Sequence, residues 1–245
     1  MSFPKISRKV LTAGNTRFLE IETKFLTKKL TLRLDKKLCT GCGVCYNVCP
    51  KEAIDRGPIG ASKRLEIAGT PDLDLSPEVA DPNKCSYCGV CVTMCPFNSL
   101  SLLVDGEEVP IPQLQINKEH ALPELDIEES ITKKSKQKVK KYFEGEIKLD
   151  TAKCAGGCST CVLVCPTGAI TKPAEKGKGG WVMSEKTVLD ERDCVYCGAC
   201  YSVCGSDAIK FKRTKIFTKK GTAFNQPFWP NIEKKLLTPK RSLVE

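Results

Sequence analysis

The fold of this chain is decided by the stretch CTGCGVCYNVCP, residues 39–50. It holds four cysteines at the spacing C-x2-C-x2-C-x3-C and ends in a proline. Three thiolates placed three residues apart on a tight loop can bind three corners of one metal cube, so a fourth corner needs a ligand from elsewhere. Four runs of this kind use all 16 cysteines of the 245-residue chain: Cys39, Cys42, Cys45 and Cys49; Cys85, Cys88, Cys91 and Cys95; Cys154, Cys158, Cys161 and Cys165; Cys194, Cys197, Cys200 and Cys204.

Three of the runs are followed at once by proline, at Pro50, Pro96 and Pro166, whereas Gly205 follows the fourth. A cysteine run of this spacing with proline after it is the pattern of bacterial ferredoxins, which carry electrons on 4Fe-4S clusters. The sequence therefore predicts four 4Fe-4S clusters. It predicts an electron carrier rather than an enzyme, with no catalytic residues of its own.

In two-cluster ferredoxins, the fourth cysteine of each run binds the cluster of the other run. Pairing run one with run two and run three with run four, this rule predicts four ligand sets. They are Cys39, Cys42, Cys45 and Cys95 for cluster 1; Cys85, Cys88, Cys91 and Cys49 for cluster 2; Cys154, Cys158, Cys161 and Cys204 for cluster 3; and Cys194, Cys197, Cys200 and Cys165 for cluster 4.

This pairing of neighbouring runs has a nested alternative, in which run one pairs with run four around runs two and three. Sequence proximity favours neighbours, and so does a finer repeat. The second run of each proposed pair reads C-x-Y-C-G-x-C, with Tyr87 and Tyr196 at the same place. An aliphatic residue also follows five positions after each run and is expected to cover its cluster where a strand begins: Ile54, Leu100, Ile170 and Ile209.

Other uses of the cysteines fit the pattern less well. Structural zinc sites use C-x2-C pairs separated by longer loops. A disulfide framework conflicts with the lack of a secretory signal and with the lysine-rich composition, which favour the reducing cytoplasm. Run three, with three residues between Cys154 and Cys158, also has the spacing of radical enzymes that cleave S-adenosylmethionine. It continues in ferredoxin register to Cys165, however, and Gly156 and Gly157 can hold the extra residue as a bulge.

Gly205 predicts a looser loop after run four.

The net charge of +10 comes from the two ends of the chain. Ten basic residues face three acidic ones in residues 1–38, and ten face two in residues 210–245, so the region between them is acidic. Each oxidised cluster adds a charge of about −2. Basic ends can steer a chain onto an acidic partner, and we see no nucleic-acid-binding signature. No stretch has the length and hydrophobicity of a membrane span.

These features predict an α+β fold class, with two tandem bacterial-type two-cluster 4Fe-4S ferredoxin domains and basic N- and C-terminal arms. Glu129 and Lys133 have helical ion-pair spacing within the charged segment between the domains. Aromatic residues in the last segment suggest docking onto another subunit, or folding back over clusters 3 and 4. The predicted division is a basic arm (1–30), ferredoxin domain 1 (31–117), a charged linker or helix (118–145), ferredoxin domain 2 (146–212) and a C-terminal docking tail (213–245).

Three stretches point beyond a generic ferredoxin. They are Ala53 to Ala61 with its Gly-Pro-Ile-Gly, Cys95 to Leu100 with its Pro-Phe-Asn and the following Asp105-Gly106, and the Cys154 to Cys158 variant. With these, residues 30 to 210 resemble the polyferredoxin subunit of archaeal formylmethanofuran dehydrogenase.

The resemblance implies a cytoplasmic subunit that relays low-potential electrons to or from the enzyme that interconverts carbon dioxide and formylmethanofuran. Catalytic subunits, and a hydrogenase or other reductase, would be its partners.

Two alternatives remain open at this point. One is a polyferredoxin of another anaerobic oxidoreductase, such as a hydrogenase, a heterodisulfide reductase or a 2-oxoacid oxidoreductase. The other is an iron-sulfur regulator that binds nucleic acid, which would need a labile cluster.

Overall fold

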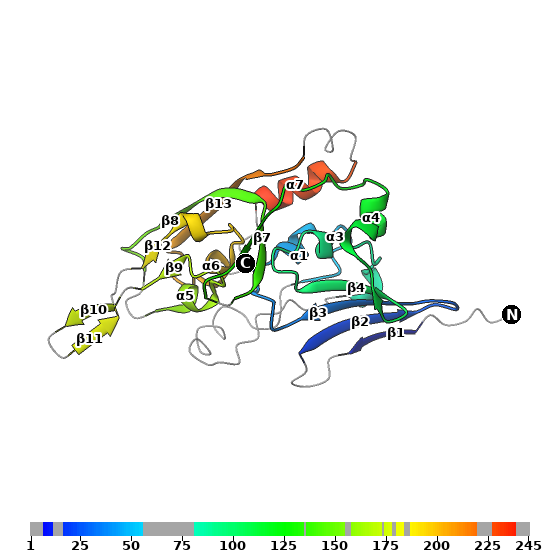
Figure 1. Ribbon diagram of the computed structural model, residues 1–245, viewed down its shortest axis with the longest axis horizontal. Coiled ribbons are helices and arrows are strands. Elements are labelled where there is room, and N and C mark those ends of the chain that lie inside the picture. Colours follow the sequence, from blue (N-terminus) through cyan, green and yellow to red (C-terminus); the bar gives the residue numbers. More distant parts are fainter. Residues whose placement is uncertain are drawn as a thin grey trace.

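The structure of the chain is a computed structural model that describes residues 7–11, 17–55, 81–134, 136–154, 158–172, 174–177, 180–183, 187–219 and 227–238. The Gly-Pro-Ile-Gly stretch and the bulge expected at Gly156 and Gly157 lie outside these residues. The described chain forms two halves joined by a hairpin, with a C-terminal helix along both (Figure 1).

The first half is built on an antiparallel sheet in the order β1-β2-β3-β4-β5. Its strands are β1 (Ser7–Leu11), β2 (Phe18–Lys24), β3 (Lys29–Asp35), β4 (Leu100–Val104) and β5 (Glu107–Glu108). The strand expected at Leu30, Leu32 and Leu34 is β3. Helices α1 (Val44–Val48) and α3 (Val90–Thr93) lie on the sheet with the 3-10 turn η1 (Pro82–Lys84).

The basic arm expected over residues 1–30 differs from the structure, because its described part forms strands β1 and β2. Side chains of β2 alternate between exposed and buried positions, as a sheet with one covered face requires. On the other face Glu20 binds Arg33 at 2.6 Å and Glu22 binds Lys29 at 3.3 Å across the β2–β3 pair. The charges of this segment are therefore partly neutralised by its neighbouring strand.

The second half repeats the two-helix arrangement with α5 (Thr160–Val164) and α6 (Ala199–Val203). Its main pair of strands is β8 (Phe143–Leu149) with β13 (Ile209–Ile216), and its smaller pairs are β9 (Ile170–Thr171) with β12 (Val188–Leu189) and β10 (Ala174–Gly177) with β11 (Gly180–Met183). The 3-10 turn η3 (Glu191–Asp193) precedes run four.

The segment expected to be a linker helix is a β-hairpin instead, formed by β6 (Glu128–Ile131) and β7 (Lys138–Lys141) after the short η2 (Ile111–Gln113) and α4 (Gln115–Lys118). Glu129 pairs with Lys138 across the hairpin at 2.6 Å, and Lys133 reaches Asp193 of the second half at 2.7 Å. Val139 on β7 is buried, and a β-branched side chain at a buried position suits a strand.

The last helix, α7 (Trp229–Leu237), lies in the segment expected to dock onto another subunit, and that docking stays a prediction. Trp229, Ile232 and Leu236 form a buried stripe at helical spacing, and the helix packs against α1 and β13. The chain itself therefore covers these apolar side chains. Figure 1 shows α7 above α1 and beside the end of β13, where the two halves meet.

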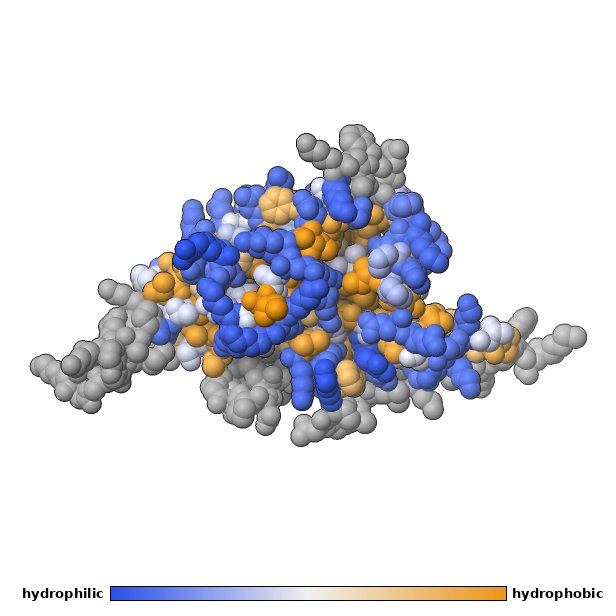
Figure 2. All heavy atoms as spheres, in the orientation of Figure 1, coloured by the Kyte–Doolittle hydropathy of each residue, from blue (hydrophilic) through white to orange (hydrophobic). Residues whose placement is uncertain are grey.

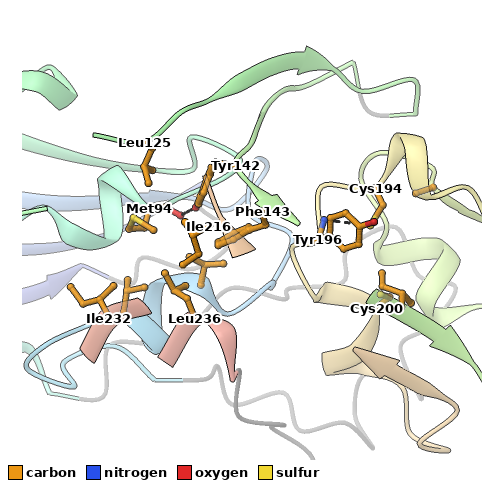
Figure 3. Close-up of a cluster of buried hydrophobic side chains, with 14 of the residues drawn as sticks. Met94, Leu125, Tyr142, Phe143, Cys194, Tyr196, Cys200, Ile216, Ile232 and Leu236 are labelled. Carbon is orange, nitrogen blue, oxygen red and sulfur yellow. Dashed lines mark hydrogen bonds between the residues drawn. The ribbon is translucent and has the colours of Figure 1, made fainter. Parts of the chain in front are cut away.

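Both hydrophobic cores contain residues of both halves. One combines Val44 and Met94 with Tyr142, Phe143 and Ile209, and the Tyr142 hydroxyl donates a hydrogen bond to the Met94 carbonyl (Figure 3). The other combines the β2–β4 side chains with residues of α5 and α6. On the face shown in Figure 2, hydrophilic residues predominate and hydrophobic ones form small groups. None of the helices in the described residues has the length and hydrophobicity that crossing a bilayer requires.

Candidate metal centres

An aspartate stands four residues before the first cysteine of every run, a feature that the spacing of the cysteines alone does not reveal. In each case its side chain accepts a hydrogen bond from the backbone N–H two residues later, which closes an Asx turn. The sequence signal is simple, D-x3-C in all four places. The four bonds are Asp35 with Lys37 at 3.0 Å, Asp81 with Asn83 at 2.9 Å, Asp150 with Ala152 at 3.1 Å and Asp190 with Arg192 at 3.1 Å.

Within the runs, residues with left-handed backbone angles bend the loops that carry the cysteines. Gly89 and Gly198 have φ of 82° and 83° at the starts of α3 and α6. A Cβ there would also lie 3.0 Å from Leu114 and 2.9 Å from Phe211. Both the backbone angle and the space available therefore favour glycine at these two positions. The equivalent tyrosines noticed in the sequence, Tyr87 and Tyr196, both have positive φ, 54° and 49°.

A third shared device follows each run. The residue three positions after the last cysteine is left-handed in all four cases, at Glu52, Asn98, Gly168 and Asp207. In the first half this turns the next N–H back to the sulfur, as Ala53 N to Cys49 Sγ and Ser99 N to Cys95 Sγ, both 3.3 Å. Such hydrogen bonds stabilise a thiolate and raise the potential of a cluster bound to it.

The aliphatic residues five positions after each run are buried, as predicted. β4, β9 and β13 begin at three of them. They remove water from the sulfur side of the loops. The four are Ile54, Leu100, Ile170 and Ile209.

Run two lines a cavity together with one cysteine of run one. Cys85, Cys88 and Cys91 face into it, and Cys49 joins them from the end of the first run. Leu32 and Tyr87 complete an apolar wall. The Tyr87 hydroxyl lies 2.7 Å from Thr23 Oγ1 and so is anchored to the sheet. Four thiols around one apolar cavity can hold a 4Fe-4S cluster.

The pKa values of the thiols in the first half show which cysteines lie near one another. Burial raises the pKa of Cys45 well above its usual value, and the charges of Cys39, Cys42, Cys91 and Cys95 raise it further. For Cys91 burial is again the largest cause of the raised pKa, and the neighbouring charges are those of Cys88, Cys85, Cys49 and Cys95. Cys95 thus acts on run one and Cys49 on run two.

The second half has the equivalent arrangement. Burial raises the pKa of Cys161 to about 11, with further contributions from Cys158, Cys204 and Cys154. The pKa of Cys200 is also raised, first by burial and then by Cys194, Cys165 and Cys161. Thiols with raised pKa values bind metal only after losing their protons, so cluster assembly here releases protons.

One pair of thiols connects the halves. The pKa of Cys197 is raised well above its usual value by burial, and the largest charge acting on it is that of Cys42 in run one. Cys42 is partly buried, and burial raises its pKa to about 11. Runs one and four therefore face each other across the junction of the two halves.

The donor set fits cubane clusters better than single ions. In the parts of the chain that the structure describes, no three His, Cys, Asp or Glu side chains are grouped so as to hold one metal ion. A zinc ion needs its four ligands to converge on one point at about 2.3 Å. A cubane does not, because each thiolate binds a different iron at a different corner.

Comparison with known proteins gives the same cofactor. The model of the 4Fe-4S dicluster domain matches residues 38–99 and 153–208, one match in each half. Polyferredoxin protein FwdF of Methanocaldococcus jannaschii is 42% identical over 48 residues, which are 20% of this chain and 13% of that protein. A chain in the solved formate dehydrogenase–heterodisulfide reductase–formylmethanofuran dehydrogenase complex of Methanospirillum hungatei is 30% identical with a TM-score of 0.73, covering 100% of this chain and 95% of that one.

These matches confirm the α+β fold class with two tandem two-cluster ferredoxin domains, the four 4Fe-4S clusters and the resemblance to formylmethanofuran dehydrogenase polyferredoxins. The dicluster matches cover the two cysteine-rich halves, and the similarity to the solved chain extends over nearly the whole length of both. The chain therefore belongs to the 4Fe-4S dicluster ferredoxins, as a polyferredoxin with two such domains.

Proposed function

We propose that this polyferredoxin is the electron-transfer subunit of a formylmethanofuran dehydrogenase complex. It relays low-potential electrons to or from the enzyme that interconverts carbon dioxide and formylmethanofuran. The full-length similarity to a chain of a complex that contains this enzyme supports the partner, and the local similarity to FwdF supports the same family. Both matches to the 4Fe-4S dicluster domain support electrons as what the chain carries.

The main observation behind the assignment of ligands to clusters is the cavity that Cys49 lines together with the cysteines of run two. It supports exchanged ligands between neighbouring runs rather than the nested pairing. We therefore keep the four ligand sets given by the exchange rule, and with them ferredoxin domains over residues 31–117 and 146–212. Cys204 beside run three and Cys165 beside run four support the same exchange in the second half.

The thiol neighbours also give the clusters an order. Cys91 and Cys45 link clusters 2 and 1, Cys42 and Cys197 link clusters 1 and 4, and Cys161 and Cys200 link clusters 4 and 3. The proposed path is therefore 2–1–4–3, a single row with an end in each half. A row of this kind suits a relay between two partners better than a store of electrons.

We assign no catalytic step to the chain itself. Its single histidine, His120, is exposed on the loop after α4, and the proposed ligand sets use all 16 cysteines. Catalysis would belong to partner subunits, and electron donors or acceptors such as a hydrogenase or a heterodisulfide reductase would meet the two ends of the row. A cytoplasmic location suits thiols that must stay reduced for metal.

A polyferredoxin of another anaerobic oxidoreductase has the same cluster row, so the partner decides between the two functions. The test is anaerobic purification of the native complex with an iron count and identification of its subunits by mass spectrometry. We expect about sixteen iron atoms per chain and the catalytic subunits of formylmethanofuran dehydrogenase. The same iron content with a different oxidoreductase would refute the partner and leave the relay.

A further inference from the structure

Arg213, on strand β13, is buried at the junction of the two halves and is 1% exposed. Its guanidinium donates three hydrogen bonds to backbone carbonyls: Nε to Tyr196 at 2.9 Å, Nη2 to Cys197 at 2.6 Å and Nη1 to Leu236 at 2.9 Å. The rings of Phe143 and Phe211 enclose it, with centroids 4.5 and 5.1 Å from Cζ. The side chain is thus fixed by run four, α7 and two aromatic faces.

The charges around this cation are unusual. Within the described residues, no acidic side chain forms an ion pair with Arg213. The ionisable groups that act on it are the thiols of Cys42 and Cys197 and the phenols of Tyr142 and Tyr46. A buried cation without a counter-charge is strongly unfavourable. The negative charge that balances it must therefore come from the cluster thiolates of runs one and four.

A second buried cation provides a contrast. Lys140 lies near Cys95, and burial lowers its pKa while Cys95 and Glu129 act to raise it. Lys140 therefore has a carboxylate within electrostatic reach, whereas Arg213 has only thiols and phenols. A lysine can also lose its proton when buried, but an arginine keeps its charge. Arg213 therefore keeps a permanent positive charge where the two halves meet.

From this geometry we propose that Arg213 is a potential-setting residue, which favours reduction of clusters 1 and 4 relative to clusters 2 and 3. Each reduction adds one negative charge to a ligand set, and a fixed cation beside that set stabilises the added charge. The two clusters in the middle of the row would then accept electrons more readily than the two at its ends. This inference rests on the ligand sets proposed above, but it is independent of the partner complex.

The test is a redox titration of the anaerobically purified full-length holoprotein, followed by electron paramagnetic resonance. In Arg213→Gln, two of the four one-electron couples should move to lower potential and two should stay. At the original midpoints of the two affected couples, the ratio of reduced to oxidised cluster should fall about tenfold, equivalent to about 59 mV for a one-electron couple. Lys212→Met, which removes the same charge from an exposed neighbour on β13, should leave all four couples in place.

Arg213→Lys keeps the charge and covers the case in which the glutamine variant does not bind its clusters. It should hold about sixteen iron atoms and keep all four couples near their original potentials. Four unshifted couples in the glutamine variant, or equal shifts of all four, would overturn the proposal. So would a lysine variant that loses its iron, since Arg213 would then act only through its shape. Cys49→Ser and Cys45→Ser, which damage different clusters if the exchange holds, test the ligand assignment separately.

Discussion

At the scale of single residues, the aspartate before each cysteine run is the least expected part of the site. Asp81 holds the turn that delivers Cys85 to the cavity of cluster 2. Its role needs an acceptor oxygen at a fixed place rather than a charge, because the donor is the backbone N–H of Asn83. The same logic applies to the other three aspartates.

Asp81→Ala should therefore destabilise the holoprotein by about 1 kcal/mol, the usual cost of losing such a capping bond. Cluster 2 should lose iron first. Asp81→Asn keeps an acceptor oxygen and should behave almost like the original chain. Anaerobic denaturation with an iron count measures both variants. If asparagine is as harmful as alanine, the charge matters and the turn does not.

Cys49 tests the exchange of ligands at the same scale. It is the last cysteine of run one but lines the cavity of run two. Cys49→Ser should therefore damage cluster 2 and spare cluster 1, with a loss of up to about four irons. Cys45→Ser is the matched variant and should damage cluster 1. Electron paramagnetic resonance of the two variants distinguishes the clusters, and identical spectra would contradict the exchange.

At the scale of elements, α7 lies in the segment expected to dock onto another subunit, and it packs against α1 and β13 of its own chain. Trp229 is buried against the chain itself, so Trp229→Ala should cost about 3–5 kcal/mol, the usual range for a large aromatic side chain removed from a core. Phe228, next to it and 54% exposed, is the control, and Phe228→Ala should change stability by less than about 0.5 kcal/mol. Thermal unfolding of both variants measures the difference. Equal, small effects would mean that α7 does not pack here in solution.

The elements also show which features could be predicted from sequence. The ligands and the aliphatic residues after each run depend on spacing over a few residues, and Ile209 is buried where the spacing placed it. Charge predicted a basic arm over residues 1–30 and a linker or helix between the two domains, whereas the described parts of both segments contain strands. Arg33 and Lys138 neutralise acidic residues across strand pairs, and such partners become visible only when the strands pair. The buried face of α7 likewise depends on α1, which is distant in the sequence.

At the scale of the whole molecule, the two dicluster domains are not independent units. The core around Tyr142 and Phe143 takes Met94 from the first half and Ile216 from the second, and α7 adds Leu236 to it (Figure 3). Val44 and Ile209 belong to the same core. Domains that share a core of this kind are expected to unfold together, whereas domains joined by a small polar contact unfold separately.

The holoprotein should therefore unfold in one thermal transition, with the clusters of both halves lost together. Iron removal should have the same global effect, because metal binding and folding share the same bonds. Anaerobic calorimetry, with cluster absorbance followed in parallel, tests both points. Tyr142→Phe removes the hydroxyl bond to Met94 but keeps the ring, so it should lower the transition temperature without dividing the transition. Two separate transitions in the original chain, each with half of the iron, would show that the shared core does not couple the domains.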